Sequence, residues 1–202
     1  AILLNINLND DTYNKEWEEV SNVYWTEEQV EQLASYSSED KTKEYVAHLA
    51  AINASGFGAR FSDIHKLFNV KQGKDRKGND VWIVNYADEK TNNKGGVPIS
   101  NKVKSLIDRY EGFEDITAKT FNDLIKEVCS DLKMKEMVTH TYTNIKGEYV
   151  EETLPFHDWV SSHTCRRSFC TNNWLKGIPN WIIMQFSKHK DEKTFLKYVK
   201  AS

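Results

Sequence analysis

The sequence predicts an α+β domain that is mainly helical and carries small antiparallel β-sheets. Apolar residues recur at helical spacing in several segments of the 202-residue chain. Two short segments alternate β-branched and aromatic residues around turn residues, which is typical of β-hairpins. Hydrophobic residues make up 39% of the chain, with six Trp, nine Tyr and nine Phe, which is enough to build a packed core. A globally disordered chain is therefore excluded.

Three helices are expected in the first third of the domain. A capping-box pattern, Thr26-Glu27-Glu28-Gln29, predicts a helix over residues 26–36. The segment 43–55 is rich in Ala, Leu and Ile and predicts a buried second helix, which the Gly-Phe-Gly run at 56–58 ends. A third helix is expected over residues 60–67, because its apolar side chains share one face.

Two hairpins are expected in the middle of the chain. The clearest strand is 81–86, and its partner begins at residues 97–99, whereas the polar residues 71–79 before them read as a turn. Lys90 would then lie in or near the hairpin turn. Alternating residues over 138–154 predict the second hairpin.

The rest of the domain is expected to be helical. The Gly-Ile-Pro sequence at 177–179 interrupts the helical pattern near the C-terminus. The helices predicted on either side of this break and earlier in the chain cover residues 100–110, 117–133, 163–174, 180–186 and 193–200.

Residues 1–25 are acidic and weakly periodic, and we expect a linker or extended arm ahead of one domain over 26–202. The chain has three cysteines and no Cys-x-x-Cys pair, which argues against a disulfide framework or a structural zinc site. A zinc site from His157, His163, Cys165 and Cys170 has poor spacing. No apolar stretch approaches the roughly 18 residues of a membrane span. The cysteine usage indicates a reducing cytosol, so we expect a cytoplasmic protein.

Charge is distributed unevenly along the chain. The net charge is −3, but eleven acidic and three basic residues before Arg60 give that part a charge of −8. From His163 to Ser202, eight basic and two acidic residues give +6. A basic end on an acidic chain indicates one face for a polyanion, although a solvated lysine-rich helix has the same composition.

Several polar residues occur in an order that points to phosphate chemistry. His163 and Arg166 are three apart and would share a helix face, from which both could reach one phosphate. His189 follows Arg166 by 23 residues, and Tyr198 follows His189 by nine. Upstream, residues 56–67 read Gly-Phe-Gly-Ala-Arg-Phe-Ser-Asp-Ile-His-Lys-Leu.

This ordered set resembles the tyrosine recombinase, or phage integrase, family. The run from Ser162 to Tyr198 is similar to the family's C-terminal signature, and residues 56–67 resemble its first arginine motif. Lys90-Thr91, followed by Val-Pro-Ile, is similar to its hairpin lysine segment. The resemblance covers about residues 25–202. The serine-rich approach to His163 and the second hairpin look most like integrases of conjugative transposons.

The resemblance implies a site-specific recombinase that cuts and rejoins DNA and that needs neither a cofactor nor a metal ion. Its catalytic residues would be Arg60, Lys90, His163, Arg166, His189 and Tyr198. The two arginines would bind the phosphate oxygens, and the two histidines would add hydrogen bonds or move protons. The tyrosine would attack the phosphorus and form a 3′-phosphotyrosine. Lys90 would protonate the leaving 5′ oxygen, with Lys94 as the alternative.

The partners implied are double-stranded DNA and, in the full-length protein, three further copies in a homotetramer. On this resemblance we expect the sequence to lack the family's N-terminal DNA-clamping domain and to have a short or missing C-terminal tail helix. Two alternatives stay open, a catalytically inactive DNA-binding relative and a relaxing type IB topoisomerase.

Two positions near the motifs carry specific expectations. Lys188 stands where the family usually has Gly before the second histidine, so we expect a different turn, because Lys lacks glycine's freedom at positive φ. Asp63 could brace the segment around Arg60 or form a helix salt bridge.

Overall fold

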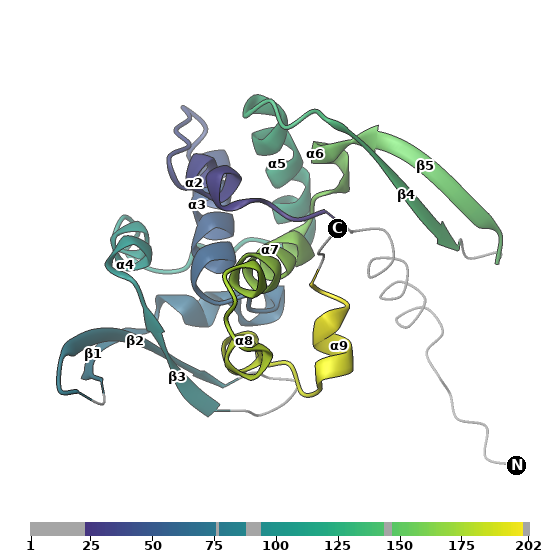
Figure 1. Cartoon of the computed structure of the whole chain (residues 1–202). Helices are drawn as coiled ribbons and strands as arrows, with labels where there is room; N and C mark the ends of the chain where they lie inside the picture. The colour runs from purple at the N-terminus through teal and green to yellow at the C-terminus, as the bar shows by residue number, and fades with distance from the viewer. Residues whose placement is uncertain (1–22, 76, 88–93, 144–146, 200–202) are drawn as a thin grey trace, which may run out of the picture.

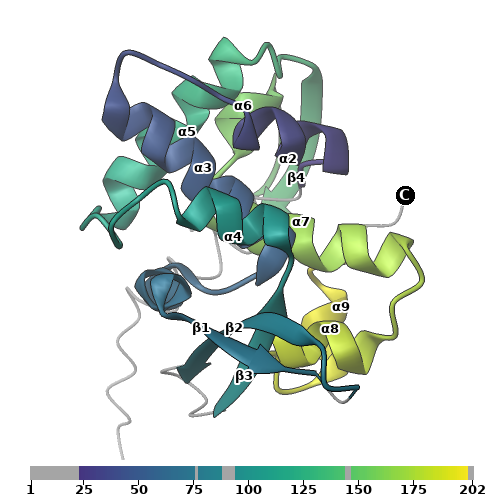
Figure 2. The same cartoon turned by 90° about the vertical axis from the view of Figure 1, so that its left-hand side faces the viewer.

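The structure is a computed structural model that describes residues 23–75, 77–87, 94–143 and 147–199. It is mainly helical with two small antiparallel sheets, as the sequence predicts. Helix α7 (Ser162–Leu175) runs through the middle of the molecule. In Figure 2 the other long helices lie above it, and the three-stranded sheet lies below with the last two helices. Residues from both ends of the domain therefore meet at α7.

Helices α2 (Glu27–Ala34) and α3 (Lys41–Gly56) confirm the first two predicted helices. The capping box forms: Gln29 N–H donates to Thr26 Oγ1 at 3.3 Å, and Thr26 N–H donates to Gln29 Oε1 at 2.9 Å. Helix α3 is buried at every position from 45 to 54, because its small alanines let neighbouring helices pack closely on all sides.

The third predicted helix is confirmed and is a 3₁₀ helix, η1 (Phe61–Phe68). The segment after it differs from the prediction. The segment expected as a turn contains strand β1 (Val70–Lys74), which pairs antiparallel with β2 (Asp80–Ala87). Strand β1 is polar and lies at the sheet edge, so backbone pairing holds it and no apolar alternation marks it.

Strand β3 (Lys94–Ile99) completes this sheet and confirms the first hairpin. Helices α4 (Asn101–Ile107) and α5 (Ala118–Asp131) follow as predicted, and Ser100 and Thr117 cap their first turns. Strands β4 (Met137–Thr143) and β5 (Tyr149–Pro155) form the second hairpin, which projects from the molecule in Figure 1.

A short helix that was not predicted, α6 (Phe156–Trp159), ties the hairpin to the core. Trp159 is buried, and its Nε1–H donates to the carbonyl of Val138 at 3.0 Å. Four residues are too few to show a helical period in the sequence.

The last helices are α8 (Asn180–Ser187) and α9 (Glu192–Leu196). The helix expected to continue to residue 200 ends at Leu196, so Tyr198 lies in a turn. The N–H of Tyr198 donates to the carbonyl of Phe195 at 2.8 Å, three residues back. Its own carbonyl accepts a hydrogen bond from Thr171 Oγ1 on α7 at 3.0 Å. The Tyr198 carbonyl is thus hydrogen-bonded to another helix, and the chain leaves the helical path at this point.

The packed part of the chain begins before residue 26. Val23 and Trp25 are buried in the core, although both were assigned to the arm. Trp25 N–H donates to Ser168 Oγ at 2.8 Å, and Asn172 Nδ2 donates to the Trp25 carbonyl at 3.0 Å. The rest of the expected arm, residues 1–22, lies outside the described residues. Among the described helices, none combines the length and apolarity that a membrane crossing needs.

Candidate active site

Arg166 lies at the point where three segments of the chain meet. It projects from α7 and is only 2% exposed. Its Nη1 donates to the carbonyl of Gly58 at 2.7 Å, and its Nε donates to Nε2 of His189 at 3.3 Å. The first arginine segment and the second histidine are thereby joined to α7, as the ordered residues in the sequence suggested.

The turn before Arg60 is shaped by Gly58 and Asn53. Gly58 has φ +60°, and a Cβ atom there would come within 2.6 Å of the Phe169 side chain. Asn53, buried on α3, accepts from the N–H of Ala59 at 2.7 Å and donates to its carbonyl at 3.1 Å. These contacts place Arg60 at the start of η1, in extended backbone with φ −68°.

The two candidate histidines share a strongly positive environment. Burial and the nearby charges of Arg167 and Arg166 lower the pKa of His163 to about 4, and Arg60 acts in the same direction. Burial, together with Arg166 and Arg60, lowers the pKa of His189 to about 2. Both rings are therefore neutral near pH 7. A site with guanidinium groups around neutral imidazoles favours an anion such as a phosphate.

Tyr198 lies against the same groups. The centre of its ring is 5.4 Å from the guanidinium carbon of Arg166 and 5.9 Å from that of Arg167. Its ring centroid is 4.8 Å from that of His189. The side chain is half-buried, so an approaching ligand has access to part of it. The structure thus brings five of the six predicted site residues into one region.

The turn at Lys188 corrects an expectation. Lys188 adopts the left-handed conformation, with φ 58° and ψ 36°, as a glycine would. Such a conformation costs a non-glycine residue roughly 1–2 kcal/mol. The N–H groups of Lys188 and His189 both donate to the carbonyl of Met184, which caps α8 and offsets part of this cost. His189 is consequently placed without a glycine before it.

The sixth predicted residue, Lys90, lies outside the described residues. Its alternative, Lys94, is the first residue of β3 and pairs with Ala87 in the register of the hairpin. The role of each stays a prediction.

Asp63 forms the salt bridge that was one of its two interpretations. Its buried carboxylate is 2.8 Å from Lys66 Nζ. Its backbone N–H also donates to the Arg60 carbonyl at 3.0 Å, so Asp63 contributes to the start of η1 as well.

The zinc arrangement considered from the sequence does not form. Within the described part of the chain, no three His, Cys, Asp or Glu side chains are grouped so that they could hold a metal ion. Cys165 and Cys170 are buried, and burial raises the pKa of Cys170 to about 11.

Four residues of this region were missed by the sequence reasoning. Asn53 and Thr171 are neutral and lie inside helices, where nothing in the sequence marks them as partners of distant backbone. Ser187 is hydrogen-bonded to the His189 ring, with Oγ 2.8 Å from Nδ1. Arg167 was detectable, because a second arginine directly follows Arg166.

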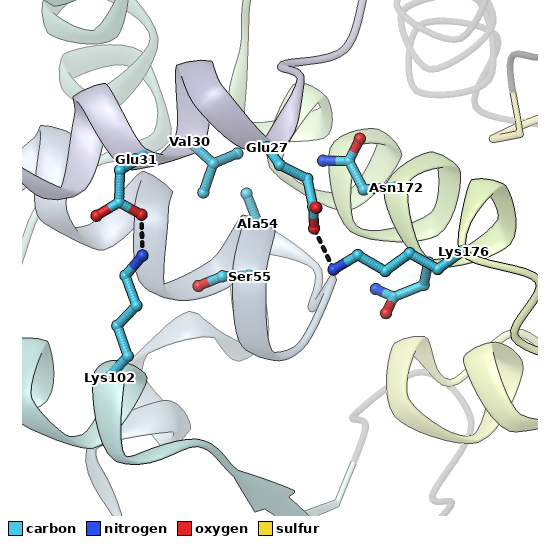
Figure 3. Close-up of a pocket in the computed structure, with 9 residues that line it drawn as sticks. Glu27, Val30, Glu31, Ala54, Ser55, Lys102, Asn172 and Lys176 are labelled. Atoms are coloured by element: carbon cyan, nitrogen blue, oxygen red, sulfur yellow. Dashed lines mark hydrogen bonds and ion pairs between the residues drawn. The ribbon is translucent and has the colours of Figure 1, made fainter.

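A separate cavity of about 250 Å³ lies between α2, α3, α4 and α7. Two ion pairs border it, Glu31 with Lys102 and Glu27 with Lys176 (Figure 3). Each ammonium group there is matched by a carboxylate, and none of the predicted site residues lines the cavity. It is therefore not the candidate active site.

Comparisons with known proteins agree with this geometry. The model of the phage integrase family matches residues 24–202. No curated protein sequence is significantly similar to the chain.

Several solved structures share the fold, among them the following three. XerH site-specific recombinase bound to difH substrate, in a pre-cleavage complex, has a TM-score of 0.55 at 12% identity, over 87% of this chain and 49% of that one. The Tn1549 transposon integrase in complex with circular intermediate DNA has a TM-score of 0.53 at 15% identity, over 89% and 63%. XerA recombinase has a TM-score of 0.54 at 17% identity, over 89% and 61%.

This chain therefore spans between about half and less than two thirds of the length of those proteins. At these identities the likeness establishes the fold, and the predicted fold of a recombinase catalytic domain is confirmed. The resemblance stated from the sequence motifs is confirmed with it.

Proposed function

Because the chain belongs to the phage integrase family, we propose that it is the catalytic domain of a site-specific DNA recombinase that acts through a 3′-phosphotyrosine. The observation that carries the proposal is the position of Tyr198, whose ring centre lies 5.4 Å from the buried guanidinium of Arg166. A tyrosine next to a fixed positive charge suits attack on an anionic phosphodiester.

The arginines supply the charge that the reaction needs. Negative charge on the phosphate oxygens is redistributed as the tyrosine oxygen approaches phosphorus. Guanidinium groups stabilise that charge, because they stay protonated and donate two parallel hydrogen bonds. Arg166 is held in place by Gly58 and His189. The charge of Arg60 lowers the pKa of both His163 and His189, so Arg60 faces the same region. Both arginines are proposed to bind the scissile phosphate.

The chemistry balances without a co-substrate. Tyr198 Oη forms a bond to phosphorus and gives up its proton, and the bond from phosphorus to the 5′ oxygen breaks. His163 is proposed to assist the loss of the tyrosine proton, since its ring is neutral. Lys90, or Lys94 in its place, is proposed to protonate the leaving 5′ oxygen. Attack by a 5′ hydroxyl on the phosphotyrosine then rejoins the strands.

DNA is the proposed partner, and a homotetramer the proposed assembly of the full-length protein in the cytoplasm. The structures of XerH and of the Tn1549 integrase are complexes with DNA. In this chain Lys190, Lys193 and Lys197 are exposed close to Tyr198 in sequence. Their charges support a DNA-facing surface around the site.

The test is a suicide-substrate trap. Nicked DNA from the ends of the parent mobile element is incubated with the full-length protein and with its Tyr198→Phe variant. We expect a covalent protein–DNA band on a denaturing gel that the variant lacks. Binding without this band would favour the inactive DNA-binding relative. Relaxation of supercoiled DNA without pairing of two sites would favour the topoisomerase.

A further inference from the structure

Ser187 is the last residue of α8 and is fully buried beside the His189 ring. Its Oγ lies 2.8 Å from the Ile183 carbonyl oxygen and 2.8 Å from Nδ1 of His189. On the other side of the ring, Nε2 lies 3.3 Å from Nε of Arg166. Both ring nitrogens of His189 are therefore engaged by protein groups.

The hydrogen-bond donors and acceptors on the two sides of the His189 ring determine which ring nitrogen carries the proton. Arg166 Nε–H only donates, which requires a lone pair on Nε2 and therefore places the single proton of a neutral ring on Nδ1. The Ser187 hydroxyl oxygen can accept from this Nδ1–H while its own proton goes to the Ile183 carbonyl, which only accepts. One neutral tautomer thereby satisfies the contacts on both sides of the ring.

The left-handed residue between them makes this contact possible. Residues two apart on a continuous helix point in different directions. Lys188, with φ 58°, ends α8 and turns the chain so that the His189 ring returns to the Ser187 hydroxyl. The unusual backbone of Lys188 is thus tied to the orientation of His189.

We propose that Ser187 is a positioning residue, which keeps the proton of His189 on Nδ1 so that Nε2 accepts from Arg166 and fixes the plane of its guanidinium. The catalytic consequence rests on the function proposed above, but the tautomer does not. Gly58 holds the other side of the same guanidinium through Nη1. With the opposite tautomer, an N–H of His189 would face the N–H of Arg166, and the guanidinium would lose that support.

This assignment separates the two histidines chemically. In this structure Nε2 of His189 is engaged by Arg166, so His189 supports the orientation of a phosphate-binding group. The His163 ring makes no hydrogen bond with the described residues, and it is left as the histidine that exchanges protons or bonds with the substrate.

The tautomer is measured directly by NMR on the full-length protein with ¹⁵N-labelled histidine. His189 is assigned through the signal that a His189→Gln variant lacks. We expect a protonated Nδ1 and an unprotonated Nε2 in the wild type at neutral pH. A protonated Nε2 in the wild type would overturn the proposal, whatever the variants do.

The role of the hydroxyl is measured with Ser187→Ala and, as the conservative control, Ser187→Thr. We expect Ser187→Ala to raise the population of the other tautomer, because the Nδ1 proton loses its buried acceptor, and to slow single-turnover cleavage of nicked DNA by about 10–100-fold. Loss of the outer partners of metal-bound histidines has effects of this size. DNA affinity should stay close to the wild type, and Ser187→Thr should retain both the tautomer and most of the rate.

These experiments distinguish a failure of the Ser187 proposal from a failure of the proposed recombinase function. If the wild type forms no covalent DNA product, the proposed function fails and the NMR result still tests the tautomer. If the wild type cleaves and Ser187→Ala matches it in rate and tautomer, the role of Ser187 is refuted. If Ser187→Ala does not fold, the wild-type spectrum decides.

Discussion

Arg166 is the residue that links the distant parts of the site. Its guanidinium is buried and donates to Gly58 and His189, and it lies beside the ring of Tyr198. A buried charge is stable only where hydrogen bonds replace its lost hydration. The contacts that stabilise Arg166 are therefore the same contacts that orient it.

Arg166→Lys tests this link, because it keeps the charge and removes the planar fork. We expect single-turnover cleavage to fall by about 10²–10³-fold, the cost of losing one well-placed donor to a reacting oxyanion. DNA affinity should fall far less, since the positive charge remains. Arg109→Lys makes the same change at an exposed position after α4 and should leave the rate unaltered. Equal rates for Arg166→Lys and the wild type would contradict the assigned role.

The lowered pKa of His163 predicts a pH-dependent stability. The pKa of His163 is 6.5 in the unfolded chain and about 4 in the folded chain. Between these two pH values the unfolded chain binds a proton that the folded chain does not. Stability is therefore full above pH 6.5 and falls as the pH drops towards 4, by at most about 1.4 kcal/mol per pH unit for one histidine. Urea unfolding at pH 7 and pH 5 measures the effect.

His163→Gln removes this titration and should make the loss of stability between pH 7 and pH 5 smaller. His65→Gln, at an exposed position on η1, is the matched control. An unchanged pH dependence in His163→Gln would show that the folded protein does not exclude the proton from this ring.

At the scale of elements, α7 is the scaffold of the site. Its N-terminus is held by Asn122 of α5, whose Oδ1 accepts the N–H of Ser162 at 2.8 Å. The next residue is His163, Arg166 follows one turn later, and further along Thr171 binds the Tyr198 carbonyl. One helix thus contacts the turn before η1, the histidine after α8 and the turn after α9.

The turn between α3 and η1 gives a prediction with an internal control. In Gly58→Ala the new Cβ lies on a residue with positive φ and clashes with the Phe169 ring. In Gly78→Ala the residue also has a positive φ, 84°, but no atom lies within 4 Å of the new Cβ. Gly78→Ala should cost about 1–2 kcal/mol through backbone strain alone. Gly58→Ala should cost a further 1–3 kcal/mol, roughly the cost of overpacking a core.

Urea unfolding of both glycine variants measures this difference. Cleavage should also fall in Gly58→Ala alone, because the Gly58 carbonyl orients Arg166. Similar losses of stability in the two variants would mean that Phe169 moves aside at little cost.

At the scale of the molecule, exposed lysines lie in two separate regions although the net charge is only −3. Lys193 and Lys197 are exposed around α9, next to Tyr198. Lys41 and Lys135 are exposed near the opposite end, at the start of α3 and after α5 (Figure 1). The average charge therefore says little about where a polyanion would bind.

Replacing both Lys193 and Lys197 by Gln should weaken DNA binding and reduce its dependence on salt. If each lysine contacts one phosphate, the slope of log affinity against log salt should fall by about 2. The control replaces Lys41 and Lys135 by Gln, which changes the net charge equally and should leave the slope unaltered. Equal effects of the two pairs would indicate a response to net charge without a defined DNA-facing surface.

Most elements were predictable from the sequence because their signals are local. The cap at Thr26 and the amphipathic period of α5 act within one turn or one helix, and the hairpin strands show their own alternation. Strand β1 and helix α6 were missed because pairing and packing with other segments hold them. Tyr198 was expected in a helix, but a bond from Thr171 holds it in a turn.

The sequence by itself determined the fold class and the order of the candidate residues, since composition, period and spacing are properties of the chain alone. Only the tertiary structure decided how those residues meet. The bond from Arg166 to Gly58 joins positions 108 residues apart, and the tautomer of His189 depends on two partners on opposite sides of its ring. Such bonds form between groups that are neighbours only after packing has buried them together, so no local pattern encodes them.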